Sequence, residues 1–278
     1  MTGATLFVVA TPLGNLGDLS LRAADLLRHV PVVAAEDTRR VRGLLAHLGA
    51  RPKVLSYHAH SPERRASLLL EILADGRNVA LVTDAGTPGV SDPGDLLVER
   101  VREAGFPVVP IPGPSAVATA LSVSGLPAGR YLFLGFAPRR GRDREAWLRS
   151  ATTAPWTVVM FESAGRIAAL LSDLAMIAGD DRRVVVAREL TKLHEEIRAG
   201  SLGVVAREFA AGETRGELTI VLAGSGSEPA EAPAPVEPAV RAAELLSHGV
   251  SRKDAAHQLA AELGLPRNVA YRMVMAIP

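Results

Sequence analysis

NVALVTDAGTPGVSDPG, residues 78–94, joins a short apolar run to a polar segment rich in turn-forming residues. Residues 78–83 are mostly apolar and include β-branched side chains, which is typical of a buried strand. Residues 84–94 then contain three glycines and two prolines. Loops of this kind at strand ends are where α/β proteins hold ligands. The segment therefore predicts a binding loop after a buried strand, with a plain strand-to-helix connection as the alternative.

Further strand-like runs flank this segment. They are LFVVAT (6–11), PVVAAE (31–36), KVLSY (53–57), FPVVPI (106–111), YLFLGF (131–136), WTVVMFE (156–162), RRVVVARE (182–189) and ELTIVLAG (217–224). Helical apolar periodicity lies between several of them, and the first helix has Ser20 or Asp18 as its expected N-cap. This alternation indicates an α/β fold with a mainly parallel sheet covered on both faces. We expect two α/β domains, residues 1–113 and 114–224, that meet near PGPSA (112–116).

The C-terminal part of the chain has a different composition. Residues 225–238 are rich in Gly, Ser, Pro, Ala and Glu without an apolar period, which predicts a flexible linker. Residues 239–278 predict three short helices, because Gly249 and Gly264 are suited to end helices and Ser251 is suited to cap one. This small unit resembles a helix-turn-helix that meets nucleic acid through its last helix. The alternative is a helical cap packed on its own protein.

Composition excludes several classes of protein. The chain has 278 residues, a net charge of +1 and no cysteine, so disulfides, thiolate metal sites, cysteine nucleophiles and iron–sulfur clusters are excluded. Aromatic residues make up 4%, which argues against stacking of several splayed bases. No apolar run approaches the roughly 18 residues of a membrane span, and no signal peptide is recognised. We therefore expect a cytoplasmic protein without membrane contact.

Several common site motifs are missing. No strand is followed by G-x-G-x-x-G, and no phosphate loop, H-E-x-x-H or G-x-S-x-G is found. The seven histidines are scattered, with His58 and His60 as the one close pair. That pair either binds a metal or consists of solvated loop residues. We expect no metal site.

The PGPSA segment has a physical interpretation of its own. Pro112 and Pro114 restrict the backbone, Gly113 allows a ligand to approach it, and Ser115 stands at the start of a predicted helix that ends near Gly125. A helix N-terminus offers unpaired N–H groups and a partial positive charge. The segment is therefore suited to hold a carboxylate or phosphate.

Taken together and in order, these loops resemble a known family. The motifs are VATPLGNLGDLSLRA, AAEDTRR, SYHAH, LVTDAGTPGVSDPG, IPGPSA, FLGFAPR, FESAGRI, ELTKLHEE and GELTIVL, within residues 6–224. The chain resembles the class III methyltransferases of the tetrapyrrole methylase fold, which use S-adenosylmethionine. Within them it is similar to the branch that methylates the ribose 2′-oxygen of a cytidine in small-subunit ribosomal RNA. Ala164 and Gly165 depart from that branch, which usually has bulkier residues there, often Pro and His, so the shape of the FESAGR loop stays open.

The resemblance implies a cofactor site in the cleft between the two α/β domains. Asp84 is suited to face the cationic end of the cofactor, and glycine permits close backbone approach. Pro12 and Ala116 have the alternative of only shaping turns. The residues carried over for cofactor binding are Pro12, Asp84, Ala85, Gly86, Thr87, Val90, Ser115, Ala116, Leu190, Leu218 and Thr219.

Catalysis requires an aligned hydroxyl and a group that takes its proton, with alignment and electrostatics supplying most of the rate. The catalytic candidates are Asp37, Glu189 and Lys192, beside Glu162 and Arg39. A carboxylate is suited to accept the proton, and Lys192 or Arg39 to stabilise the alkoxide. Three alternatives stay open: Arg39 or Lys192 contacts RNA phosphate, or Glu189 only pairs with Lys192.

The basic residues proposed to contact RNA have ordinary solvated surface as their alternative. They are Arg39, Arg139, Arg140, Arg252, Lys253 and Arg267. The resemblance implies methyl transfer to the ribose 2′-oxygen of a cytidine in the decoding region of 16S ribosomal RNA, within the small subunit, by a homodimer. The alternatives are a tetrapyrrole or protein acceptor on the same fold, and a non-catalytic assembly factor.

Overall fold

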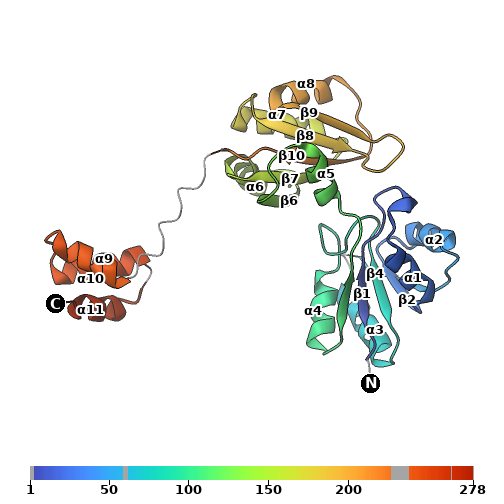
Figure 1. Ribbon diagram of the computed structural model, residues 1–278, viewed down its shortest axis with the longest axis horizontal. Helices are drawn as coiled ribbons and strands as arrows, with labels where there is room; N and C mark the ends of the chain where they lie inside the picture. The colour runs from blue at the N-terminus through green and yellow to red at the C-terminus, as the bar shows by residue number, and fades with distance from the viewer. Residues whose placement is uncertain (1–2, 59–61, 227–237, 264, 278) are drawn as a thin grey trace. The chain divides into compact units, whose positions relative to one another are not determined.

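The structure is a computed structural model, and it describes residues 3–58, 62–226, 238–263 and 265–277. Two compact units divide the chain, Met1–Gly226 and Ser227–Pro278. The first unit holds two five-stranded sheets, and the second is a small group of helices (Figure 1). The expected fold class, two α/β domains followed by a helical unit, is confirmed. No helix of the described residues is long and apolar enough to cross a membrane.

The first sheet is entirely parallel, as expected. Its strands are β1 (Leu6–Val9), β2 (Val32–Ala35), β3 (Lys53–Ser56), β4 (Val79–Val82) and β5 (Val108–Ile111), in the order β3-β2-β4-β1-β5. Two of its three inner strands, β2 and β4, are buried at every position. Burial on both faces explains why these strands appear in the sequence as continuous apolar runs.

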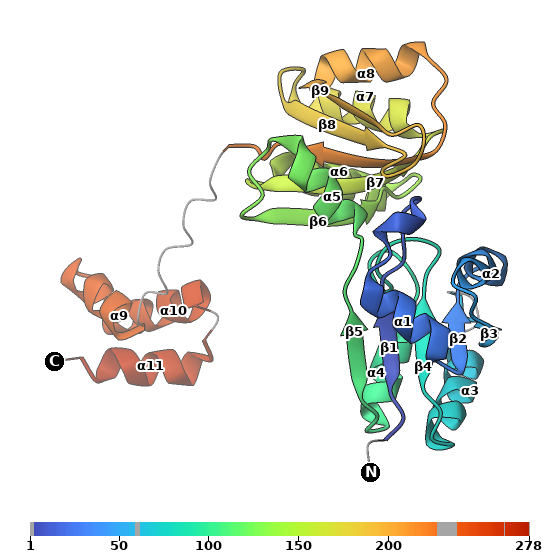
Figure 2. The same ribbon diagram turned by 45° about the vertical axis from the view of Figure 1, so that its right-hand side comes forward.

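Helices cover both faces of this sheet (Figure 2). One face packs against α1 (Leu21–His29) and α2 (Thr38–His47), and the other against α3 (Pro62–Ala74) and α4 (Asp95–Glu103). Ser20 caps α1, because its hydroxyl accepts a hydrogen bond from the Ala23 N–H at 3.1 Å. Because all strands of this sheet are parallel, the loops that follow them leave the sheet at the same edge.

The second sheet differs from the expectation because it is mixed rather than mainly parallel. Its strands are β6 (Tyr131–Phe136), β7 (Thr157–Ser163), β8 (Arg183–Arg188), β9 (Glu196–Ser201) and β10 (Glu217–Leu222). In the order β6-β7-β10-β8-β9, the pair β6–β7 is parallel and every other pair is antiparallel. The β8–β9 pair is antiparallel because a short loop joins these two strands, and β10 also runs opposite to both of its neighbours.

Helices pack unevenly on the second sheet. The helices α6 (Arg142–Thr153), α7 (Ile167–Ala178) and α8 (Leu202–Ala211) form one core with one face of the sheet. On the opposite face, α5 (Ala116–Ser124) forms a smaller core with β7, β8 and β10. Gly125, with φ of 61°, ends α5 as expected. The end of this face that carries Phe161, Ala187 and Thr219 lines a cavity.

The C-terminal unit consists of α9 (Pro238–Ser247), α10 (Arg252–Leu263) and α11 (Arg267–Met275), the three expected helices. They share an apolar core that includes Leu245, Leu259 and Val274. The Ser251 hydroxyl accepts from the Asp254 N–H at 3.2 Å, so it caps α10 as expected. Most of the predicted linker, residues 227–237, and the predicted helix end at Gly264 lie outside the described residues.

Candidate active site

The loop after β4 is tied to the loop after β1 at the carboxyl edge of the first sheet. Thr11 and Gly86 exchange two backbone hydrogen bonds, of 2.8 and 3.0 Å. Gly86 has φ of 76°, a conformation that a side chain rarely permits. The first part of the DAGTPGVSDPG segment is therefore a preorganised loop rather than a plain connection.

Two further loops are tied to the same segment. The Thr87 hydroxyl donates to the Pro114 carbonyl at 3.3 Å, which links the loop after β4 to PGPSA. The Asp84 carboxylate accepts from the Asp37 N–H at 3.1 Å and lies 3.5 Å from the Arg40 guanidinium. Loops after β1, β2, β4 and β5 therefore converge on one place, as ligand sites of parallel sheets do.

Four strands of the second sheet present one residue each at the same level. Phe136 on β6 is in register with Phe161 on β7, and Thr219 on β10 is in register with both Phe161 and Ala187 on β8. A register shift precedes Phe136, at Gly135 with φ of 60°. The rings of Phe136 and Phe161 lie 5.6 Å apart between centroids. This row forms a partly aromatic wall.

The ELTK segment forms a turn between β8 and β9. Glu189 and Thr191 adopt φ of 52° and 65°, values that cost backbone strain. The Lys192 ammonium lies 2.9 Å from the Glu189 carboxylate and 3.0 Å from that of Glu217. Burial opposes the charge of Lys192, but these two hydrogen bonds outweigh it and hold the pKa of Lys192 above its usual value.

The same turn contacts the first loop of the chain. The Asn15 N–H donates to the Thr191 hydroxyl at 3.2 Å, and the Lys192 stem lies where a side chain on Gly14 would stand. The two sheets are thus joined at Asn15 and Thr191, beside the charged group of Lys192.

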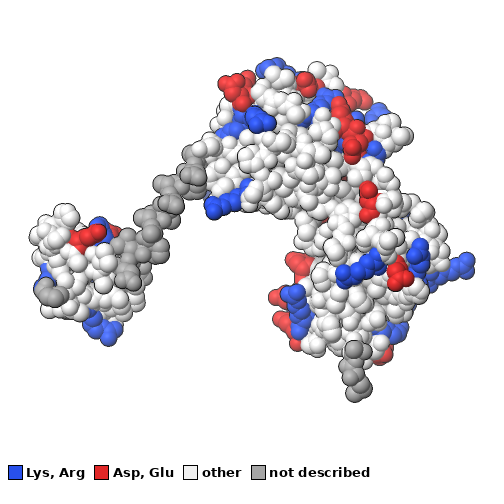
Figure 3. All heavy atoms as spheres, in the orientation of Figure 1, with Lys and Arg blue, Asp and Glu red and all other residues white. Residues whose placement is uncertain are grey.

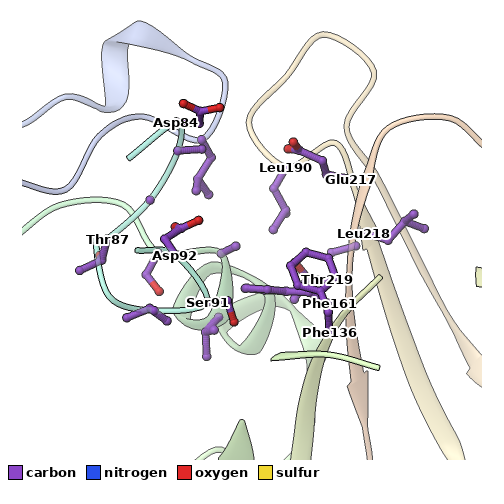
Figure 4. Close-up of a pocket in the computed structure, with 18 of the residues that line it drawn as sticks. Asp84, Thr87, Ser91, Asp92, Phe136, Phe161, Leu190, Glu217, Leu218 and Thr219 are labelled. Atoms are coloured by element: carbon purple, nitrogen blue, oxygen red, sulfur yellow. The ribbon is translucent and has the colours of Figure 1, made fainter. Parts of the chain in front are cut away.

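A cavity of about 460 Å³ lies between these elements. Figure 4 shows Asp84, Thr87, Ser91 and Asp92 on one side and Phe136, Phe161, Thr219 and Leu218 across from them. Its volume is in the range of small-molecule sites, about 300–1,000 Å³. The lining residues are Leu13, Glu36, Arg40, Asp84, Ala85, Gly86, Thr87, Val90, Ser91, Asp92, Ser115, Ala116, Val117, Phe136, Phe161, Glu162, Ser163, Ala187, Leu190, Lys192, Gly216, Glu217, Leu218 and Thr219.

Acidic groups outnumber basic ones around the cavity, where Arg40 and Lys192 face five carboxylates. Burial raises the pKa of Asp92 to about 7, and the nearby carboxylates of Glu36 and Asp84 add to the effect. Burial and Asp84 also raise the pKa of Glu36. The cavity is therefore suited to a cation, and it is unfavourable for a phosphate.

The residues proposed for the cofactor gather here. Every one of them lines the cavity except Pro12, whose neighbour Leu13 does so. The Ser115 hydroxyl makes no capping hydrogen bond to α5. The N-terminus of α5 therefore faces the cavity, and the Ser115 side chain does not cap its N–H groups.

The proposed catalytic residues are placed unequally. Lys192 lines the cavity, whereas Glu189 lies behind it and binds Lys192. Asp37 is outside the lining and caps α2, accepting from the Arg39 N–H at 2.7 Å. Glu162 lines the cavity, but its buried carboxylate is paired with Arg166.

The residues proposed to contact RNA lie outside the cavity. Arg39 is exposed and within 3.4 Å of Asp37, and Arg139 and Arg140 are exposed between β6 and α6. In the C-terminal unit, the Arg252 guanidinium donates to the carbonyl oxygens at the end of α11, while Lys253 and Arg267 are exposed. On the face drawn in Figure 3, basic and acidic side chains are interspersed.

Sequence reasoning did not assign several residues that line the cavity. Glu36 and Arg40 belong to the quoted motif AAEDTRR, and Asp92 to DAGTPGVSDPG. Phe136 and Phe161 belong to FLGFAPR and FESAGRI. The motifs marked the right segments, but only the packing shows which of their side chains turn inward.

Metal binding finds no support among the described residues, which include no group of three or more His, Asp or Glu side chains placed to hold an ion. Of the histidine pair, His60 lies outside the described residues.

Comparison with known proteins decides the family. The model of the Tetrapyrrole (Corrin/Porphyrin) Methylases matches residues 5–206. The chain belongs to this family. It is 45% identical over 273 residues to a Xylella fastidiosa protein named Ribosomal RNA small subunit methyltransferase I, covering 97% of this chain and 98% of that one. An Escherichia coli O157:H7 protein of the same name is 40% identical, covering 97% and 94%.

Solved structures share the fold. Uroporphyrin-III C-methyltransferase from Thermus thermophilus, complexed with S-adenyl homocysteine, is similar with a TM-score of 0.57 at 22% identity, covering 80% of this chain and 98% of that one. Diphthine synthase is similar with a TM-score of 0.63 at 16% identity, covering 79% and 90%. The likeness covers about four fifths of this chain and shows the fold.

The cofactor of this family member is S-adenosylmethionine. The cavity fits it, because the carboxylates of Glu36, Asp84 and Asp92 are suited to its cationic groups. Leu190 and Ala187, both buried, offer an apolar surface to a ring. The cavity therefore has an acidic side and an apolar side, as a cationic nucleoside requires.

Proposed function

We propose that the protein transfers the methyl group of S-adenosylmethionine to small-subunit ribosomal RNA, at the ribose 2′-oxygen of a cytidine in the decoding region of 16S RNA. The supporting observation is similarity over nearly the whole chain to proteins named Ribosomal RNA small subunit methyltransferase I. That similarity includes the C-terminal unit, to which we assign a share of RNA binding. A ribosomal acceptor places the activity in the cytoplasm.

The bound cofactor supplies an electrophilic methyl group on a cationic sulfur. The chain contributes position and charge: the tied loops at Gly86 and Thr87 fix one side of the cleft, and the strand row at Phe161 and Thr219 fixes the other. Such preorganisation aligns an incoming hydroxyl without further reordering. Lys192, held by Glu189 and Glu217, contributes a positive charge beside the developing alkoxide.

An exposed aromatic ring marks the acceptor side of the cleft. The Phe136 side chain lines the cavity and is 56% exposed, so part of its ring is open to a ligand. One such ring offers a stacking surface to a single base turned out of its RNA. Arg139 and Arg140 follow three and four residues later and are exposed, so they are placed to meet phosphates near that base.

The experiment is transfer of labelled methyl from S-adenosylmethionine to small ribosomal subunits of a strain that lacks this gene. We expect labelling at one cytidine, in a product that resists alkaline cleavage because its 2′-oxygen is blocked. Free 16S RNA is tested beside the subunits, and sedimentation of the enzyme tests the proposed homodimer. Labelling of a base, of a tetrapyrrole or of protein instead, or no labelling at all, contradicts the proposal.

A further inference from the structure

Asp92 lines the cavity but is not among the residues that the family motifs assign to the cofactor. It follows Ser91, which has a strained φ of 63°. The loop touches the second sheet there, since a Cβ on Gly135 would lie 2.9 Å from the Ser91 hydroxyl. Asp92 thus stands where the loop after β4 meets the strand that carries Phe136 (Figure 4). This is the acceptor side in the function proposed above.

Of the other four carboxylates that line the cavity, three lie beside a cation, and the positive charge of Arg40 also acts on the fourth, Glu36. Glu217 is bound by Lys192, Glu162 is paired with Arg166, and Asp84 lies beside Arg40. A carboxylate bound by a cation is a weak base, because the cation stabilises its charged form. Asp92 has the Thr83 hydroxyl as its hydrogen-bonding partner, and the charges of Glu36, Asp84 and Glu217 all act against its ionisation.

Charge in the cleft determines when Asp92 holds a proton. Burial, with Glu36 and Asp84, raises its pKa to about 7, so in the free protein near neutral pH the group is divided between its two forms. A cation placed in the acidic side of the cleft lowers that pKa, because it favours the carboxylate. Once the ligand has lost its positive charge, the pKa of Asp92 rises again and Asp92 takes up a proton.

We propose that Asp92 accepts the proton of the acceptor hydroxyl during methyl transfer. The bond between the acceptor oxygen and the methyl carbon forms while the sulfur–methyl bond breaks and leaves its electron pair on sulfur. The hydroxyl proton passes to the Asp92 carboxylate, which becomes neutral as the positive charge on sulfur disappears. The inference rests on the proposed function, because it requires a hydroxyl acceptor, but its first test needs no acceptor.

Proton release on ligand binding provides this first test. S-adenosylmethionine and S-adenosylhomocysteine differ by the methyl group and the positive charge, so calorimetry at pH 7 in buffers of different ionisation enthalpy isolates the effect of that charge. We expect the cationic ligand to release about 0.5 proton more than the neutral one from the wild-type protein, given the pKa of about 7 for Asp92. The excess disappears in Asp92→Asn and remains in Asp95→Asn, an exposed residue outside the cavity.

Single-turnover methyl transfer provides the second test. Asp92→Asn should lower the rate about 10²- to 10⁴-fold, the usual contribution of a general base, with affinity for S-adenosylmethionine changed by only a few-fold. The residual rate should lose its pH dependence. Glu36→Gln is the informative comparison, because Glu36 lines the same acidic side and also has a raised pKa. A pH dependence should persist in Glu36→Gln, with its midpoint moved to lower pH because the charge of Glu36 helps to raise the pKa of Asp92.

The outcomes of the two tests separate the ionisation of Asp92 from the proton transfer and from the proposed acceptor. Equal proton release by the two ligands in the wild-type protein, or undiminished excess release in Asp92→Asn, overturns the ionisation that the inference requires. Wild-type turnover in Asp92→Asn overturns the proton transfer, while ribosomal labelling leaves the proposed function intact. Conversely, normal proton release by a protein that labels no ribosomal RNA contradicts the proposed acceptor and not the ionisation of Asp92.

Discussion

Replacement of Gly216 by alanine tests the geometry that holds the ELTK turn against the cleft. Gly216 has φ of 93°, and a Cβ there would lie 2.3 Å from Glu189 Oε1 and 2.5 Å from Glu189 Cγ. The Glu189 carboxylate accepts from the Glu217 N–H at 3.0 Å and from Lys192 at 2.9 Å. The added methyl group therefore has to displace this carboxylate from both donors.

The cost has two parts. A residue other than glycine at this φ costs about 1–3 kcal/mol. Loss of hydrogen bonds to the charged group adds about 1–2 kcal/mol, at the lower end for such bonds because the Glu189 and Lys192 side chains are 20% and 29% exposed. We expect a loss of about 2–5 kcal/mol in the free energy of unfolding. For a unit of this size that lowers Tm by roughly 4–20 °C.

Calorimetric melting of the full chain measures this, with Gly212→Ala as the matched control. Gly212 has φ of −133° and nothing within 4 Å of the position of an added Cβ, so its replacement should change Tm by less than about 2 °C. Gly216→Ala should also weaken cofactor binding, since Gly216 itself lines the cavity. If both variants melt together with the wild type, the tight contact between Gly216 and Glu189 is refuted.

Four further outcomes are expected. Thr87→Trp fills the cleft and should abolish S-adenosylmethionine binding in calorimetry with Tm nearly unchanged; retained affinity contradicts the assigned loop. Phe136→Ala should lower affinity for the RNA acceptor by about 1–3 kcal/mol, whereas Tyr131→Ala, an exposed ring on the same strand that does not line the cavity, should not. Lys192→Ala should lower turnover roughly 10²-fold while RNA affinity holds; the reverse pattern, with a salt dependence flatter by about one counterion, indicates a phosphate contact. Truncation after Gly226 should leave a folded, cofactor-binding protein, because this unit has its own cores, but methyl transfer to RNA should fall sharply, and full activity would exclude a role for the last helices.

The strands β2 and β4 of the first sheet were predictable from sequence because they are buried on both faces. Continuous apolar runs such as β4 carry that burial directly, and the Ser20 cap of α1 is a local signal. In contrast β9, Glu196–Ser201, was assigned no strand, because it is an edge strand with polar and glycine residues and alternating exposure. Its antiparallel pairing with β8 is a consequence of the short turn between them.

The sequence by itself determined the class of fold, the family and the segments that surround the cleft, because ordered turn motifs at strand ends are local features that survive without tertiary knowledge. Tertiary structure alone decided which side chains of those motifs act together. Phe161 meets Phe136 on one neighbouring strand and Thr219 on the other through strand register, and Lys192 reaches Glu217 across 25 residues of sequence. Asp92 differs from the other aspartates of the chain only through its burial and its acidic neighbours. Burial and acidic neighbours depend on distances between residues that are remote in the chain. No pattern along the sequence encodes such distances.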